Sequence, residues 1–222
     1  MTAQGRSPPS NAVAIAADAL ARVASARAAI APERLPGAAL VGPRRSAPSE
    51  ALGEAYPVYV VAASDVARRR SLALAKRAAW RYTVIRGDKP SGVLELRPVG
   101  RTFKFSKLHE GERGEASERA VAVVRDRPRG LSVRFLRIPS LNLLAAWGHD
   151  ARRPGSDVLV PVPPVSRPFQ PFAAMTAAEL VEAVRGLAPR PQPRGTRSTD
   201  ATLPTEKRSP PPARGRGSTS RR

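Results

Sequence analysis

The chain contains no cysteine. This absence excludes disulfide bonds, cysteine-ligated zinc and thiol catalysis. Histidine is nearly as scarce, and a catalytic base of the serine-hydrolase type must be either His109 or His149. The zinc motif H-E-x-x-H is absent as well, because Arg113 occupies the position one helical turn after His109 where a second histidine is required. We therefore expect neither a metal site nor a cofactor.

Nucleotide-binding loops and membrane-spanning stretches are also missing from the sequence. There is no G-x-x-x-x-G-K-[ST] loop and no G-x-G-x-x-G turn after a strand. No apolar run approaches the roughly 20 residues that a membrane-spanning helix needs. Asp18, Arg22 and Arg27 interrupt the Ala-rich N-terminal segment, which argues against a secretory signal. We expect a cytoplasmic protein without nucleotide-driven chemistry.

Aromatic residues make up only 5% of the chain, whereas proline and positive charge are abundant, with 24 prolines and a net charge of +20. Residues 188–222 combine nine Lys and Arg residues with two acidic ones and little apolar surface, which predicts a disordered basic tail. Its Arg214 and Arg216 alternate with glycine, as in segments that bind RNA loosely. Such a tail attracts nucleic acid or another polyanion. Arg outnumbers Lys 33 to 5, which is also the bias of a GC-rich genome, so the sequence leaves the reason for the charge open.

Proline and alanine divide the remaining chain into regions. Residues 1–10 predict a disordered start, and residues 11–31 predict an Ala-rich helix that is either a docked arm or an independent helix. Residues 32–52 contain several prolines among small residues and are typical of a linker. Residues 53–187 carry the apolar patterning of a single α+β domain.

The patterning within this domain predicts an antiparallel, in part mixed, sheet of about five to six strands with two or three helices packed on it. The strand candidates are Val58–Val61, Tyr82–Arg86, Val93–Arg97, Arg101–Leu108, Leu131–Phe135 and Val158–Val162. A change of phase at Leu136 predicts a bulge or a bend near Pro139. The apolar stretch Leu141–Trp147 is expected to be buried, and Pro161 favours a sheet edge.

Three helices are expected in the domain. The first begins at Ser64 or Asp65 and runs to about Trp80, and the second covers about Gly114–Asp126. The third begins at the capping box Thr176-Ala177-Ala178-Glu179 and ends near Gly186. Helical spacing places Arg69, Arg70, Lys76 and Arg77 together on the outer face of the first helix, which predicts a basic patch that binds nucleic acid.

Two strand segments carry aromatic residues in a pattern of special interest. Val58-Tyr59-Val60 and Arg101-Thr102-Phe103-Lys104-Phe105 resemble the first and third strands of the RNA-recognition motif. The resemblance implies that Tyr59, Phe103 and Phe105 stack on RNA bases and that Arg101 contacts a phosphate. Alternating phenylalanines are also typical of a sheet core, so the sequence leaves the role of Phe103 and Phe105 open.

His149 and the adjacent Asp150 are candidates for the catalytic histidine and acid of a hydrolase, and they follow the apolar stretch at the end of a strand. Ser140 is near in sequence but has no G-x-S-x-G context. Three hypotheses therefore stay open. The first is a non-enzymatic binding or interaction protein with a basic surface and a polyanion-attracting tail. The second is an RNA-binding protein, and the third is a hydrolase that uses His149 and Asp150.

Overall fold

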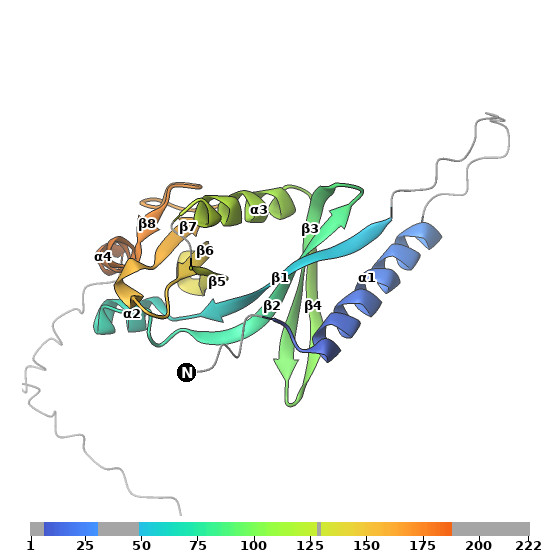
Figure 1. The fold of residues 1–222 in the computed structure, drawn as a ribbon, viewed down its shortest axis with the longest axis horizontal. Helices are drawn as coiled ribbons and strands as arrows, with labels where there is room; N and C mark the ends of the chain where they lie inside the picture. Colours follow the sequence, from blue (N-terminus) through green and yellow to red (C-terminus); the bar gives the residue numbers. More distant parts are fainter. Residues whose placement is uncertain (1–6, 31–48, 128–129, 188–222) are drawn as a thin grey trace, which may run out of the picture. The chain divides into compact units, whose positions relative to one another are not determined.

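The computed structural model describes residues 7–30, 49–127 and 130–187, which form one mixed eight-stranded sheet and four α-helices (Figure 1). The strands are β1 (Glu50–Val60), β2 (Lys76–Arg86), β3 (Lys89–Val99), β4 (Thr102–Glu110), β5 (Ser132–Ile138), β6 (Leu143–His149), β7 (Val158–Pro161) and β8 (Met175–Thr176). The helices are α1 (Ser10–Ile30), α2 (Ala63–Arg69), α3 (Glu112–Arg125) and α4 (Ala177–Leu187). The α+β class with a mixed sheet is confirmed, with more strands and helices than expected.

The strand order in the sheet is β4-β3-β2-β1-β5-β6-β7-β8. The first four strands and the last four strands each form an antiparallel meander. The two meanders meet where β1 and β5 pair in parallel. Helix α3 connects the edge strand β4 to the central strand β5, so it crosses the sheet between them (Figure 1).

Helices cover both faces of the sheet. The face that we call the α3 face packs Ala120, Val121 and Val124 of α3 against Val58 and Phe135. On the opposite face, which we call the far face, α1 covers one half of the sheet, where its small residues pack against the following side chains of β2 and β3: Trp80, Tyr82, Val84, Leu94 and Leu96. Helices α2 and α4 cover the other half, over β5, β6 and β7. Strand residues under these helices are therefore buried on either face, whereas most of the edge strand β4 stays exposed or half-buried.

The prediction of a helix that continues to Trp80 is wrong. Helix α2 ends at Arg69, and Arg70 adopts a left-handed conformation with φ of 52°. Lys76 and Arg77 already pair with Val60 and Tyr59 of β1 as the start of β2. The Ala- and Leu-rich composition of this segment favours a helix, but the ladder with β1 satisfies its backbone instead.

Of the bulge or bend expected near Pro139, the structure has the bend and no bulge, since Ser132–Ile138 pair with β6 without a register shift. Phe135 and Leu136 are both fully buried because each face of this strand is covered, and this explains the change of phase in the sequence. The chain does bend at Pro139, in a 3-10 turn over Pro139–Leu141. Strand β6 is buried for most of its length, and β8 pairs only with Val158 and Leu159, so Pro161 lies beyond its end.

Two local predictions are confirmed in detail. Helix α3 covers the expected segment, and its Gly114 lies against the backbone of Gly92 in β3, where an added Cβ would be 2.6 Å from the Gly92 nitrogen. The capping box forms as expected, with Thr176 N donating to Glu179 Oε2 over 2.7 Å and Glu179 N donating to Thr176 Oγ1 over 3.2 Å. The close contact between the glycines fixes the position of α3 over the sheet.

The remaining regional predictions fall mostly outside the described ranges. The tail at 188–222 and most of the linker lie there, although Glu50–Leu52 at the linker's end belong to β1. Helix α1 packs against the sheet through Ala12, Ala16, Ala19 and Leu20. None of the described helices has the length and apolar character required to cross a membrane.

Candidate functional site

A row of charged residues crosses three strands on the α3 face. Arg81 of β2 lies directly opposite Glu95 of β3, and Glu95 lies opposite Lys107 of β4. Their neighbours in the strands point to the far face, where Trp80, Tyr82, Leu94 and Leu96 form the core under α1. Alternation therefore directs these three charged side chains toward α3, into a space between sheet and helix.

Glu95 is the centre of this cluster, and its side chain is only 2% exposed. Arg81 Nη1 and Arg137 Nη2 each lie 2.6 Å from Glu95 Oε1, and Lys107 Nζ lies 3.4 Å from Oε2. Burial alone would raise the pKa of Glu95, but the charges of Arg137, Arg81 and Lys107 outweigh burial and hold the pKa below its ordinary value. One ionised carboxylate thus faces three cations.

Helix α3 adds a fourth cation to the cluster. Arg113 Nη1 lies 3.0 Å from Nδ1 of His109, and within the described ranges no carboxylate is within ion-pair distance of Arg113. Burial, followed by the charges of Arg113 and Lys107, lowers the pKa of His109. A neutral His109 ring accepts the Arg113 hydrogen bond, so the imidazole adds no charge near pH 7. The cluster therefore holds three positive charges more than Glu95 balances.

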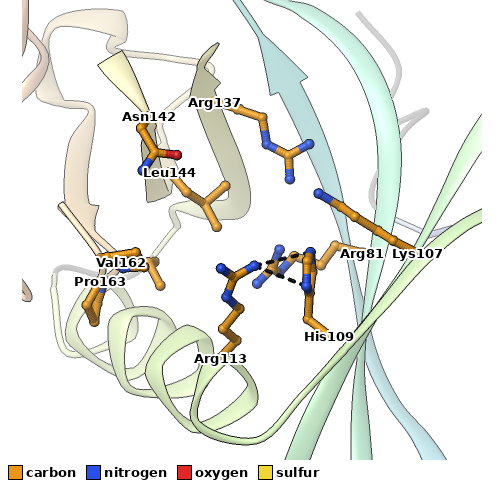
Figure 2. A pocket seen from close by; sticks show the side chains of 10 residues that line it. Arg81, Lys107, His109, Arg113, Arg137, Asn142, Leu144, Val162 and Pro163 are labelled. Carbon is orange, nitrogen blue, oxygen red and sulfur yellow. Dashed lines mark hydrogen bonds between the residues drawn. The ribbon is translucent and has the colours of Figure 1, made fainter. Parts of the chain in front are cut away.

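The cationic groups surround a cavity of about 140 Å³. Figure 2 shows the ends of Arg81, Lys107, Arg113 and Arg137 directed toward a common space, with Asn142 and Leu144 on the opposite wall. We call this cavity the basic pocket. Arg81 is almost fully buried there: its Nη2 donates to Ser117 Oγ over 2.8 Å, whereas its Nε has no acceptor among the described residues. Burial lowers the pKa of Arg81, against the effect of Glu95.

The basic patch expected from the sequence does not form on one helix face. Arg69 ends α2, Arg70 follows it, and Lys76 and Arg77 begin β2, all of them exposed. Arg77 lies 5.5 Å from the ring centre of Trp80. The basic patch fails to form for the same reason that the predicted helix does not continue to Trp80: residues 76 to 80 belong to the sheet.

The strand order also differs from what the RNA-recognition-motif resemblance implies. Tyr59 lies on β1 and Phe103 and Phe105 on β4, with β2 and β3 between them, so the two strands that carry the rings are about 14 Å apart at the usual strand spacing. Phe103 packs partly against the core under α1, and Phe105 is 39% exposed. Arg101 lies in the exposed turn before β4. Neighbouring bases cannot stack on all three rings at this separation, and RNA binding stays a prediction without support from the topology.

His149 pairs with a different carboxylate from the expected one. Its Nδ1 lies 3.0 Å from Oδ1 of Asp157, whereas Asp150 accepts hydrogen bonds from Arg152 N and Ser156 Oγ in an exposed loop. Ser71 lies in the same region, but its Oγ accepts from Ala73 N, and no hydrogen bond joins it to His149 among the described residues. The hydrolase hypothesis stays a prediction, with Asp157 as the partner of its histidine.

Two further predictions concern metals and the tail. The described residues contain no group of three or more His, Asp or Glu side chains that could hold a metal ion. Arg214 and Arg216 lie outside the described ranges.

The basic pocket was missed because its cationic residues are distributed from position 81 to position 137 without a local motif. A signal is nevertheless present in three tripeptides, Trp80-Arg81-Tyr82, Leu94-Glu95-Leu96 and Leu136-Arg137-Ile138. In each, a charged residue lies between two large apolar residues of a strand. If both faces of the sheet are covered, this pattern predicts a buried charge, and opposite charges on different strands predict that these residues meet.

Comparisons with protein-family models, with curated proteins and with solved structures found no match.

Proposed function

We propose that this protein is a non-enzymatic binding protein whose basic pocket holds an oxyanion of the size and charge of phosphate. The observation that carries the proposal is the buried Arg81, which shares Glu95 with two other cations and whose Nε has no acceptor. A buried donor without a partner costs about 1–3 kcal/mol. The partly exposed Lys107 and the exposed Arg113 add positive charge that Glu95 does not balance. A bound dianion would supply acceptors to the pocket and balance this charge.

The chemistry of the pocket favours an oxyanion. Guanidinium groups present paired N–H donors that match the geometry of phosphate oxygens, and Arg81, Arg113 and Arg137 approach the cavity from a strand, a helix and a second strand. Lys107 contributes a further charge. The excess of about three positive charges suits a divalent anion better than a single carboxylate.

The size of the pocket limits the ligand to a small group. Its volume of about 140 Å³ is well below the roughly 300–1,000 Å³ of pockets that enclose drug-sized molecules. A free phosphate fits, as does one phosphate group of a larger ligand that extends into solvent. A phosphate polymer such as nucleic acid would gain further contacts from the basic segment 188–222, and its affinity should fall linearly on a log–log scale with added salt.

The proposal is tested by calorimetric titration of the full chain with sodium phosphate, at an ionic strength held constant with chloride. We expect saturable binding of phosphate and none of chloride. Arg113→Gln should weaken binding by on the order of tenfold, because a charge-assisted hydrogen bond is lost. Arg69→Gln is the matched control, since Arg69 is also an exposed arginine and lies on α2, away from the pocket, and we expect it to leave affinity unchanged. The absence of phosphate binding, or equal losses in both variants, would contradict the proposal.

A further inference from the structure

A second and larger cavity lies on the far face of the sheet, separate from the basic pocket. Its volume is about 610 Å³, within the range of small-molecule sites. The floor comes from β1, β5 and β6, one wall from the loop between α2 and β2, and the other from the start of α4. The residues that matter for its chemistry are Tyr59, Leu72, Arg134, Trp147, His149 and Val181. We call this cavity the aromatic cleft.

Arg134 is the unusual residue of the aromatic cleft. Its guanidinium carbon lies 3.7 Å from the ring centre of Trp147 and 4.8 Å from that of Tyr59. Its Nε is buried and has no acceptor, and no carboxylate within the described part of the chain is at ion-pair distance. Burial lowers the pKa of Arg134. The aromatic rings hold this cation in place without neutralising it.

The acid that lines the cleft, Asp157, is hydrogen-bonded to other donors. Its Oδ2 accepts from Trp147 Nε1 over 2.9 Å, and its Oδ1 accepts from Asp150 N over 3.0 Å and lies 3.0 Å from His149 Nδ1. Asp157 is buried, so these bonds fix the rings of Trp147 and His149 as a rigid floor. Because the floor is already ordered, ligand binding would not have to restrict these side chains, and the entropy cost of binding is lower.

The walls supply apolar surface. Leu72 and Val181 are both buried and belong to the core cluster that joins α2 and α4 to the sheet, and Ala75 and Ala177 pack against it. A ligand in the aromatic cleft would therefore bury an apolar body beside the guanidinium of Arg134. Arg70 also lines the cleft from an exposed position, and the two guanidinium groups exceed the one lining carboxylate, Asp157, by one positive charge. Bidentate pairing with guanidinium is the geometry of a carboxylate, and this excess matches one negative charge.

We propose that the aromatic cleft binds a small monocarboxylic acid with an apolar body, with its carboxylate paired to Arg134. The site is independent of the phosphate site, because the two cavities lie on opposite faces of the sheet and share no lining residue.

The test uses the two indole N–H signals of the unmodified ¹⁵N-labelled protein, which has Trp80 and Trp147 as its two tryptophans. Trp147 lines the aromatic cleft, and Trp80 lies in the core under α1 as an internal control. Cyclohexanecarboxylate is titrated first, and cyclohexanecarboxamide, which has the same shape without the charge, is titrated second. We expect the carboxylate to shift the Trp147 signal saturably, with affinity on the order of tenfold higher than that of the amide, and to leave Trp80 unchanged.

A pair of variants assigns the effect to one residue. Arg134→Gln should remove the preference for the carboxylate. Arg119→Gln should keep it, since Arg119 also lies over an aromatic ring, 4.2 Å from the centre of Phe172, but outside the cleft. A static Trp147 signal, equal affinities for acid and amide, or a preference that survives Arg134→Gln would overturn the proposal. The comparison of acid with amide needs no variant, so it decides the matter even if Arg134→Gln does not fold. Failure of the phosphate titration would leave this result unaffected.

Discussion

Arg81 and Glu95 form a buried ion pair from directly opposed positions of β2 and β3, with 2.6 Å between Arg81 Nη1 and Glu95 Oε1. Arg137 and Lys107 share the same carboxylate. Glu95→Gln would leave three cations without a counter-charge. We expect the free energy of unfolding to fall by about 3–5 kcal/mol, as for other broken buried pairs. Urea unfolding measures the loss, and phosphate should restore more stability to the variant than to the wild type.

The control is Glu54→Gln, which removes an exposed ion pair with Arg125. Exposed pairs are worth about 0–1 kcal/mol, so this change should be nearly silent. Similar losses in the two variants would show that Glu95 does not organise the pocket.

The acid dependence of stability follows from the lowered pKa of Glu95. A carboxylate with a lowered pKa in the folded state stabilises the protein above its ordinary value of 4.5, and this contribution is lost as the pH falls through the folded value. Wild-type stability should therefore fall more steeply below about pH 4.5 than that of Glu95→Gln. Parallel pH profiles, measured by urea unfolding, would contradict the assignment.

His109 should report on the charge in the pocket. Its pKa is lowered in the free protein, so the unfolded chain binds the proton first as the pH falls below the ordinary 6.5, and stability decreases there. A bound anion favours the imidazolium and should raise the pKa of His109. Proton NMR resolves the two histidines, and His109→Gln assigns them. Phosphate should move the titration of His109 upward, whereas an unmoved His109 titration would contradict an anion in the pocket.

Gly114 is expected to be irreplaceable at the contact between α3 and β3. In an ordinary helix position, Gly→Ala stabilises by up to about 1 kcal/mol. At Gly114 the new Cβ would lie 2.6 Å from the backbone nitrogen of Gly92, so we expect Gly114→Ala to lower the melting temperature and weaken phosphate binding through displacement of Arg113. Gly186→Ala in α4 is the control, because no atom lies within 4 Å of its added Cβ, and its melting temperature should hold or rise. A stable Gly114→Ala variant would contradict the packing.

Asp157, rather than Asp150, should support His149 and Trp147. Asp157→Asn removes one acceptor and the charge from a carboxylate that receives three hydrogen bonds, and we expect a loss of roughly 1.5–3 kcal/mol with a shift of the Trp147 indole signal. Asp150→Asn should leave that signal in place, since Asp150 bonds within an exposed loop. A shift of the Trp147 signal in Asp150→Asn but not in Asp157→Asn would contradict this assignment and would support Asp150 as the partner of His149.

Much of the fold was predictable because local signals and tertiary environment agree. The hairpins of β2, β3 and β4 alternate clearly, and the capping box at Thr176 acts within a few residues. The segment from Lys76 to Trp80 was misassigned because its composition favours a helix, whereas pairing with β1 decides its conformation. Phe135 and Leu136 broke the expected alternation because both faces of β5 are covered, which depends on elements distant in the chain.

The candidate site was hidden for a related reason. Arg81, Glu95 and Arg137 belong to three different strands, and only the register of the sheet brings them together. The basic residues that stood out in the sequence, Arg69 and Arg70, are exposed and lie apart from the basic pocket. Charge density along the chain thus suggested an anionic ligand, as we propose, but did not indicate where the basic pocket lies.

The central claim is that the basic pocket holds a phosphate-like anion, and crystals soaked in selenate test it most directly. Selenate is a tetrahedral dianion like hydrogen phosphate and scatters anomalously. We predict an anomalous peak between the guanidinium groups of Arg81 and Arg113, lost on back-soaking with phosphate and weaker in Arg113→Gln crystals soaked at the same concentration. Peaks confined to exposed arginines, with none in the basic pocket, would contradict the account.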